Sequence, residues 1–517
     1  MLFNAPEFIL VFLPVTLAVF FALGSMAQFR AALAWLVAAS LFFYGWWEPR
    51  YLLLILVSVL ANFLFGLWLS RCRHRPERTP VLCLGVAANL GLIGYFKYSS
   101  FLVASVGAIA GAEWSIAEVL LPIGVSFFTF QQIAYLVDVA RGETQETDLL
   151  TYSLFVTFFP QLIAGPILHH KEMLPQFRRP ETFRPSAENL CIGGTIFVIG
   201  LFKKVVIADN FGLIASPVFA EAETGATLHF IQAWRGAFAF SFQLYFDFSG
   251  YSDMAIGLAR LFGIRLPLNF NSPYKATSII DFWRRWHMTL SRFLRDYLYF
   301  ALGGNRKGPA RRYVNLMITM LLGGLWHGAA WTFVLWGGIH GFFVIVNHLW
   351  RRVFRRTIDR WWSRLTARSL TMVIIVLAWV PFRAESLDGA LAVFDGMTNL
   401  PYILEARLGA GGAVLGALGF RFEGPWFTDA DLRAVFWLGL SLALVWCLPN
   451  TQQWMAAYAP GLRAPDLADR PGPSASGGLV SALAWQPTVV WASVVAVLLS
   501  SSLLSLQRVT EFLYFQF

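Results

Sequence analysis

The sequence predicts an all-α integral membrane protein with roughly a dozen membrane-spanning helices in one polytopic domain, residues 1–517. Hydrophobic residues make up 57% of the chain and charged residues only 14%, whereas about a quarter of a soluble chain is charged. The mean hydropathy is +0.58. Apolar stretches of about 20 residues recur along the chain, and each is long enough to cross about 30 Å of hydrocarbon as a helix.

The clearest spans are the stretches with the fewest polar residues. These are Phe8–Leu23, Ala31–Trp47, Tyr51–Ser70, Val81–Phe96, Cys191–Ile207, Tyr313–Leu325, Trp331–Leu349, Leu370–Val380, Ala434–Leu448 and Val489–Leu504. Two further stretches, around Val119–Val139 and Tyr152–Leu168, contain proline, glycine, glutamine or aspartate. They predict broken or re-entrant helices inside the protein, because irregular backbone at membrane depth is tolerated only there or beside water. The Pro-, Ser- and Gly-rich part of residues 450–483 predicts a flexible loop.

The positive charge is concentrated in the loops between the predicted spans. The chain carries a formal net charge of +10, and its basic residues cluster around Arg71–Arg78, Lys203-Lys204, Arg306–Arg312 and Arg351–Arg364. Short loops rich in Lys and Arg stay cytoplasmic. With these basic loops in the cytoplasm, the alternation of spans places the Glu48-Pro49-Arg50 loop and the N-terminus outside the cytoplasm. The charge is therefore interpreted as membrane topology rather than nucleic-acid binding. The four cysteines form no CxxC pair, and the histidines show no ligand spacing, so no metal site is predicted.

Two histidines are the strongest candidates for chemistry. His327 lies in Gly323-Gly324-Leu325-Trp326-His327-Gly328 inside an apolar run, and His287 follows Asp281-Phe282-Trp283-Arg284-Arg285-Trp286. A histidine at membrane depth is costly and normally faces a cavity or a partner. Each could instead only bridge neighbouring helices by a hydrogen bond. The pair favours acid–base chemistry, with residues 240–345 as the catalytic core.

The surrounding residues predict a binding site for an anionic substrate. Ser278–Phe300 has too many arginines for a lipid-exposed span and is interpreted as an amphipathic or half-inserted helix beside an aqueous funnel. Arg284 and Arg285 would hold an anionic group, unless they only reach to the headgroups. Trp283, Trp286, Trp326 and Asn305, of the Gly303-Gly304-Asn305-Arg306 turn, complete the expected lining. Asp253 either caps a helix at Met254–Phe262 or serves the site.

These segments together resemble the membrane-bound O-acyltransferase (MBOAT) family, and within it the bacterial branch that acylates cell-envelope polymers. The matching stretches are Leu244–Ala255 (LYFDFSGYSDMA), Phe282–His287 (FWRRWH), Arg295–Tyr299 (RDYLY), Gly303–Arg306 (GGNR) and Gly323–Gly328 (GGLWHG). Weaker similarity at Gly94–Tyr98 (GYFKY), Leu121–Phe127 and Ala164–Ile167 extends the resemblance over most of the chain.

The resemblance implies a ring of tilted helices around a thin partition with a central tunnel, and it assigns His327 and His287 to the catalytic positions. It implies transfer of an acyl group, here acetyl, from acetyl-CoA or another cytoplasmic donor, with no bound cofactor. The acyl group would cross the bacterial inner membrane to a periplasmic partner of the SGNH acetyltransferase type, for O-acetylation of a polysaccharide such as alginate.

Two alternatives remain open from the sequence. One is D-alanyl transfer to teichoic acid, and the other, from a different class, is a multi-helix transporter. For the enzyme, the dry surroundings of His327 favour a general base that takes the proton of the acceptor hydroxyl. His287 would then position the acyl carbonyl or donate a hydrogen bond to its developing oxyanion.

Overall fold

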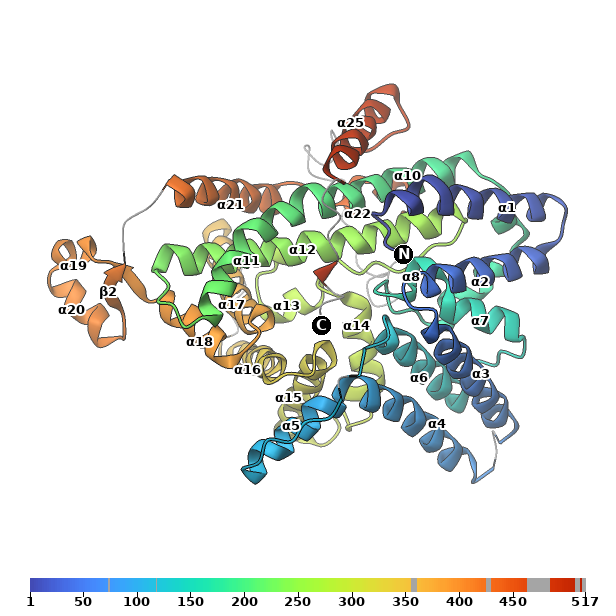
Figure 1. Cartoon of the computed structure of the whole chain (residues 1–517), viewed down its shortest axis with the longest axis horizontal. Helices are drawn as coiled ribbons and strands as arrows, with labels where there is room; N and C mark the ends of the chain where they lie inside the picture. The colour runs from blue at the N-terminus through green and yellow to red at the C-terminus, as the bar shows by residue number, and fades with distance from the viewer. Residues whose placement is uncertain are drawn as a thin grey trace.

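The computed structural model describes residues 1–72, 75–117, 119–354, 360–424, 429–462, 484–506 and 512–513, and these residues form an almost wholly helical protein (Figure 1). The only strands among them are β1 (Asn399–Pro401) and β2 (Arg421–Gly424), a short parallel pair. Helices radiate from a crowded centre, where both the first residues of the chain and the segment 512–513 lie. The predicted all-α class is confirmed.

The first half of the chain supplies most of the outer helices. They are η1 (Phe8–Phe12), α1 (Leu13–Ser25), α2 (Phe29–Gly45), α3 (Arg50–Arg71), α4 (Arg78–Ile93), η2 (Gly94–Tyr98), α5 (Ser99–Ala110), α6 (Val125–Arg141), α7 (Leu149–Thr157), α8 (Phe159–Leu162), α9 (His170–Phe177), η3 (Pro180–Phe183), α10 (Ala187–Phe202), η4 (Lys203–Ala208) and α11 (Asp209–Glu223).

The second half contributes the long central helix and the segments that carry both histidines. They are α12 (Phe230–Leu261), η5 (Pro273–Lys275), α13 (Ile279–Trp283), α14 (Met288–Phe293), η6 (Leu294–Tyr299), α15 (Gly308–His327), α16 (Trp331–Val353), α17 (Trp361–Arg383), α18 (Leu387–Gly396), α19 (Ile403–Leu408), α20 (Ala410–Ala417), α21 (Asp429–Cys447), α22 (Thr451–Trp454), η7 (Ala456–Tyr458) and α25 (Val489–Ser505).

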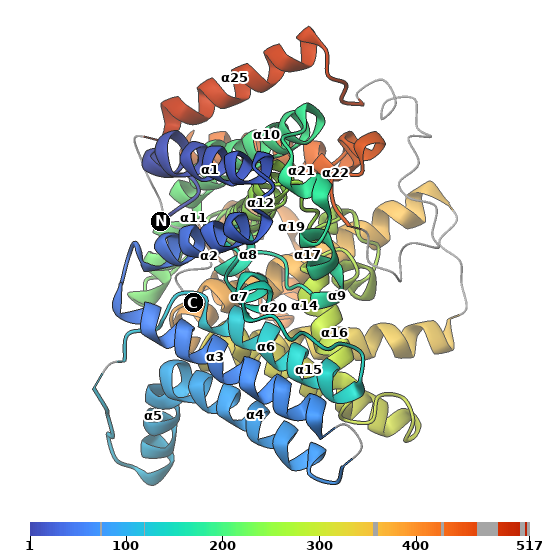
Figure 2. The same ribbon diagram turned by 90° about the vertical axis from the view of Figure 1, so that its right-hand side faces the viewer.

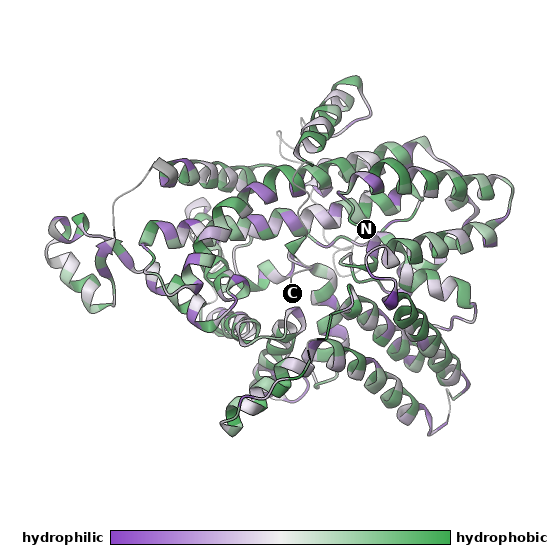
Figure 3. Cartoon of the chain, viewed as in Figure 1, coloured by the Kyte–Doolittle hydropathy of each residue, from purple (hydrophilic) through white to green (hydrophobic). Residues whose placement is uncertain are grey.

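Six helical segments of the described chain are long and apolar enough to cross a membrane, so the protein is a multi-pass membrane protein. They are Phe8–Ser25, Arg50–Arg71, Arg78–Ala110, Ala187–Glu223, Trp331–Val353 and Trp361–Arg383. Phe29–Gly45 and Val489–Ser505 are shorter apolar helices. This is fewer than the expected dozen, which stays a prediction. Apolar residues cover much of the peripheral helices, while hydrophilic residues gather at loops and along the centre (Figure 3).

The outer surface is suited to lipid. On α3, Leu53, Val57, Leu60 and Leu64 are 70%, 57%, 48% and 54% exposed. Their spacing of three or four residues puts them on one side of the helix. In water such a continuous apolar stripe would be unfavourable, whereas hydrocarbon solvates it. The final helix α25 is likewise apolar and lies across the outside of α1 and α10 (Figure 2).

The central helix α12 is held by close contacts and buried ion pairs. A Cβ on Gly257 would come within 2.6 Å of the Gly193 carbonyl oxygen, so α10 and α12 touch through glycine. Lys204 of η4 pairs with Asp247 at 2.8 Å and with Asp209 at 2.8 Å. Asp247 thus ties η4 to α12. These bonds satisfy charges whose burial would otherwise be costly.

Several charged side chains enter the protein from π-helical turns. Lys97 lies on η2, Lys203 and Lys204 on η4, and Arg295 on η6. A π turn inserts one residue into a helix and locally re-aims its side chains, and such turns are often found at functional sites. The three π segments therefore mark where polar groups leave the lipid-facing pattern and turn inward.

The predicted interruptions of two helices are confirmed. Gly124, at φ +73°, precedes α6, and a break at Phe158 separates α7 from α8. For the predicted loop 450–483, residues 463–483 lie outside the described residues. The part before them forms α22 and η7, and Thr451 donates a hydrogen bond to Asp253 at 2.7 Å.

Candidate active site

The fold brings His287 and His327 together near the centre of the protein. The centroids of their imidazole rings are 6.5 Å apart, and the side chains come from positions forty residues apart in the chain. His287 is fully buried and His327 is 5% exposed. The pairing that the sequence suggested is thus present in space.

His287 lies at a break in the backbone. Ser278 caps the short helix α13 by accepting a hydrogen bond from the Asp281 backbone N–H, and the chain then turns before α14 begins at Met288. At this turn His287 has φ +42°, in the left-handed region. The sequence had predicted one amphipathic helix over Ser278–Phe300, and that prediction is wrong. A left-handed non-glycine residue costs about 1–3 kcal/mol and is found most often at functional sites.

The turn at His287 is clamped by an extended segment that follows α12. Asn271 N–H donates to the Arg285 carbonyl at 2.9 Å, and Met288 N–H donates to the Asn269 carbonyl at 2.9 Å. The Asn269 side chain lies 3.0 Å from Nδ1 of His287. These strand-like bonds compensate the strained residue and fix both its backbone and its ring.

His327 is the last residue of α15, and its own carbonyl is held by a lysine. Lys97 Nζ donates to the Trp326 carbonyl at 2.7 Å and to the His327 carbonyl at 2.8 Å. Tyr98 Oη donates to the Leu325 carbonyl at 2.8 Å. The last carbonyls of a helix lack partners within it, and a cation at that end is also favoured by the helix dipole. Lys97 and Tyr98 therefore cap α15 at the end that carries His327.

Aromatic rings surround the imidazole of His327. The ring centroids of Trp326, Trp336 and Phe382 lie 4.9, 5.0 and 5.2 Å from that of His327. Trp331 is 55% exposed and its ring contacts Phe101. His340 is packed between Phe282, Trp283, Trp336 and Trp379.

The glycines around His327 serve close packing. A Cβ on Gly324 would lie 2.2 Å from the Phe333 carbonyl oxygen, and one on Gly337 would lie 2.4 Å from the Met320 carbonyl oxygen. The backbones of α15 and α16 thus touch, and only glycine permits this approach. Close backbone approach therefore accounts for Gly324.

A basic cavity of about 580 Å³ adjoins the histidines. Trp283 lines it and contacts Trp336, whose ring in turn contacts His327. Met288, the residue after His287, also lines it. The polar lining consists of Arg284, Ser291, Arg292, Arg295, Tyr299, Asn305, Arg312, Thr319 and His348. Neither imidazole of the pair lines the cavity itself.

Two of the cavity's arginines are neutralised by carboxylates. Arg292 pairs with Glu172 at 2.8 Å, and Arg295 pairs with Asp296 at 2.7 Å. Arg312 donates to the His348 ring at 3.1 Å, and Arg284 has no ion-pair partner among the described residues. Arg284 and Arg312 are therefore the cations best placed for an anionic ligand, since guanidinium groups bind phosphate and carboxylate oxygens in pairs.

The remaining predicted lining residues do not line this cavity. Arg285 pairs with Asp281 at 3.0 Å. Trp286 is 2% exposed and packs 5.0 Å from the ring of Trp379. Trp326 stacks on Phe130, with centroids 5.3 Å apart. These three residues instead pack around the segments that carry the two histidines.

Asp253 belongs to another polar cluster. It lies inside the unbroken helix α12, so the predicted cap of a helix at Met254–Phe262 is wrong. Its carboxylate pairs with Lys203 at 2.6 Å and accepts from Gln452 at 3.0 Å. The lysine on η4 is what makes a buried carboxylate tolerable in the middle of the helix.

The sequence missed three residues that position the pair: Lys97, Asn269 and Phe382. Lys97 lies in the Gly94–Tyr98 stretch, whose resemblance to the family was its only signal. Asn269 and Phe382 lie in segments without a distinctive pattern. Each meets its histidine only through a long-range contact.

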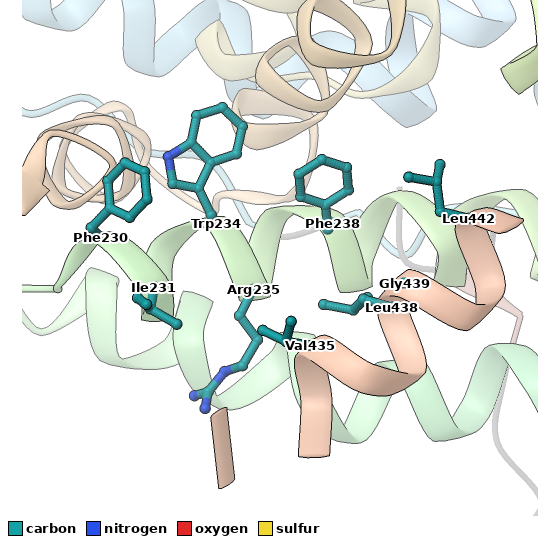
Figure 4. Close-up of a pocket in the computed structure, with 9 residues that line it drawn as sticks. All are labelled: Phe230, Ile231, Trp234, Arg235, Phe238, Val435, Leu438, Gly439 and Leu442. Carbon is teal, nitrogen blue, oxygen red and sulfur yellow. The ribbon is translucent and has the colours of Figure 1, made fainter. Parts of the chain in front are cut away.

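A second cavity, of about 320 Å³, is apolar and lies elsewhere (Figure 4). It is lined by α12 and α21, by Phe230, Ile231, Trp234, Arg235, Phe238, Val435, Leu438, Gly439 and Leu442. Neither histidine of the pair contributes to it. This lining has only an arginine beside apolar groups and offers no acid–base pair.

Comparison with known proteins agrees with this geometry. The family model described as "MBOAT, membrane-bound O-acyltransferase family" matches residues 41–380. The chain is 44% identical over 426 residues to "Peptidoglycan O-acetyltransferase" of Helicobacter pylori, covering 77% of this chain and 80% of that protein. It is 39% identical to "Probable alginate O-acetylase AlgI" of Azotobacter vinelandii over 100% of both chains. "Teichoic acid D-alanyltransferase" of Streptococcus thermophilus is 28% identical over 46% of this chain and 59% of its own length.

Proposed function

Because the chain belongs to the membrane-bound O-acyltransferase family and is an O-acetyltransferase of that family, we propose that it uses a cytoplasmic thioester donor. The acetyl group then crosses the bacterial inner membrane and is used for O-acetylation of an extracytoplasmic polysaccharide. The observation that carries the proposal is the pair of buried imidazoles, 6.5 Å apart, next to a cavity rich in arginine.

The proposed chemistry needs two functions from the pair. One imidazole accepts the proton of the acceptor hydroxyl while its oxygen attacks the acyl carbon, and the other hydrogen-bonds to the carbonyl oxygen that gains charge. The new acyl–oxygen bond forms as the acyl–sulfur bond breaks. The proton then leaves with the thiol, so the enzyme returns to its starting state. Closely packed aromatic rings around His327 exclude water, which would otherwise hydrolyse the thioester.

The basic cavity is the proposed donor site. Its volume of about 580 Å³ is within the usual range of roughly 300–1,000 Å³ for small-molecule pockets. Arg312 is near the start of α15 and His348 near the end of α16, beside the basic loops predicted to be cytoplasmic. Acetyl-CoA carries phosphates that suit these arginines, and it acts as a substrate rather than as a bound cofactor. An acyl carrier protein is the alternative thioester donor.

Acetyl transfer to a polysaccharide is favoured over D-alanyl transfer to teichoic acid by the relatives. Those named for O-acetylation align over 77% to 100% of this chain, while the D-alanyltransferases align over 46% and 51%. A polymer outside the membrane requires delivery of the acetyl group on that side. We propose a periplasmic SGNH-type acetyltransferase as the partner and place the N-terminus on the same side.

The test is acetyl transfer by the purified protein in vesicles. Vesicles exposing the basic loops are given acetyl-CoA with a labelled acetyl group, and the label is followed into covalent product in the lumen with the partner and polymer enclosed. We expect transfer that depends on the protein and is lost in His327→Ala. Uptake of label without a covalent product would support a transporter, and transfer only from a D-alanyl carrier would support the teichoic-acid alternative.

A further inference from the structure

The Asn269 side chain is the centre of a hydrogen-bond network around His287. Its Oδ1 lies 3.0 Å from His287 Nδ1, 3.4 Å from the Thr289 backbone nitrogen and 3.0 Å from Thr289 Oγ1. On the other side of the amide, Nδ2 donates to Ser252 Oγ at 3.3 Å. Asn269 is 1% exposed and Thr289 is 3% exposed, so no bulk water competes for these bonds.

This network fixes which end of the Asn269 amide faces His287. A backbone N–H can only donate, so the atom facing Thr289 N must be the amide oxygen. Thr289 Oγ1 already accepts a hydrogen bond from the Ile167 backbone N–H at 3.0 Å, and its own hydrogen is therefore free to point to Asn269. The amide oxygen has no hydrogen to give. His287 Nδ1 must consequently carry the proton and donate it to Asn269.

The other nitrogen of His287 then has a defined role. In a neutral imidazole only one nitrogen bears hydrogen, so a proton on Nδ1 leaves Nε2 with its lone pair. Nε2 is buried and has no hydrogen-bond partner among the described residues. A buried acceptor without a protein partner is open to a donor on a ligand. A hydroxyl that donates to Nε2 is such an atom.

We propose, resting on the acyl transfer inferred above, that Asn269 is a positioning residue which makes His287 Nε2 the acceptor of the hydroxyl proton. The hydroxyl oxygen bonds to the acyl carbon, the acyl–sulfur bond breaks, and the proton passes through Nε2 to the departing thiolate. While the ring carries both protons, Asn269 Oδ1 holds the Nδ1–H and so stabilises the cation. His327 hydrogen-bonds to the carbonyl oxygen. This division of roles is the reverse of the one expected from the sequence.

The test is single-turnover acyl transfer by the full-length protein in nanodiscs, measured for variants of both residues. His287→Gln is expected to lose about 10²–10⁴-fold in rate, because glutamine cannot serve as a base. Asn269→Leu should lose about 10- to 100-fold in the single-turnover rate constant at an unchanged half-saturating donor concentration, by analogy with groups that orient a metal-bound histidine. Asn269→Asp keeps every acceptor in the network and should recover most of the rate.

A double-mutant cycle separates positioning from a purely structural role. If Asn269 acts through His287, then Asn269→Leu should cause no further loss in a His287→Gln background. Asn89→Leu is the matched control, since it removes another buried amide, paired with Asn62 at 2.6 Å, that contacts neither histidine, and we expect a rate near that of the wild type.

Several results would overturn the proposal. They are an additive double mutant, an Asn269→Leu rate within twofold of the wild type, or a His287→Gln rate within tenfold of it. The His287→Gln result would overturn the proposal even if the Asn269→Leu variant does not fold. A wild-type protein that transfers no acyl group would instead refute the proposed function, so the two failures are distinguishable.

Discussion

Replacing Lys97 by methionine tests whether the end of α15 must be held for turnover. Methionine keeps an unbranched apolar stem and removes only the ammonium group, which donates to the carbonyls of Trp326 and His327 at 2.7 and 2.8 Å. A hydrogen bond to a charged group contributes about 1.5–3 kcal/mol. Removing the ammonium also removes its desolvation cost. We therefore expect a net loss of about 2–3 kcal/mol at the end of the helix, less than the sum of the two bonds.

The consequence for catalysis follows from the position of His327. Its carbonyl is one of the two that Lys97 holds, so loss of the cap lets the last turn of α15 relax and moves the imidazole. A displacement of about 1 Å at a reacting group can cost about 10²-fold in rate, which corresponds to about 2.7 kcal/mol of transition-state stabilisation. Lys97→Met should therefore lower kcat by about 10²-fold, with a much smaller change in the KM for the donor.

The assay is acetyl transfer across a range of donor concentrations, with thermal unfolding in nanodiscs measured alongside. Tyr98→Phe is the matched control, because it removes one neutral hydrogen bond from the neighbouring Leu325 carbonyl, worth about 1 kcal/mol. It should lower stability slightly and keep kcat within about threefold. A Lys97→Met enzyme with the wild-type kcat, or a Tyr98→Phe enzyme that is equally impaired, would refute the reasoning.

Three further outcomes are expected. His327→Ala should reduce acyl transfer by about 10²–10³-fold, because it removes the hydrogen bond to the developing oxyanion, while the protein stays folded and membrane-inserted, and wild-type polymer acetylation in cells would remove His327 from the mechanism. Arg312→Met should raise the KM for acetyl-CoA and weaken its dependence on salt, since it removes one cation of the cavity; an unchanged KM would place the donor elsewhere. A cysteine near Glu48 should react with a membrane-impermeant reagent from outside and one near Arg73 should not, and the opposite labelling would invert the assumed topology.

The features that the sequence predicted well are those set by local composition. Long apolar runs must become helices in lipid, because the backbone finds no other hydrogen-bond partner there. The two histidines stood out because ionisable side chains are rare at membrane depth. The interruptions near Gly124 and Phe158 were predicted from the proline, glycine and polar residues around them. In each case the feature depends on residues within a few positions of it in the sequence.

The features that the sequence did not predict depend on distant partners. For Asp253 a helix cap and a role in the site were both open, because the sequence does not show that Lys203, fifty positions away, neutralises it inside α12. Lys97 and His327 are 230 positions apart, and nothing local to either marks the contact. The break at His287 was missed because only tertiary hydrogen bonds make a left-handed histidine tolerable. Local propensity favours a helix there.

The histidine pair is restrained in ways that cost stability, which indicates what the fold is organised to do. His287 has a strained backbone and a buried nitrogen without a hydrogen-bond partner among the described residues. The half-buried ammonium group of Lys97 donates to two carbonyl groups. Among the described residues, no carboxylate is within hydrogen-bond distance of it. A core evolved only for stability would replace such groups with apolar ones. Each restraint instead fixes one histidine before any substrate binds: Asn269 fixes the ring of His287, and Lys97 fixes the helix end that carries His327. Preorganised groups need little rearrangement in the transition state, and this is the main source of electrostatic catalysis. The strained and unpaired groups at the centre lower the stability of the fold, and in return they hold the two imidazoles in place with their centroids 6.5 Å apart.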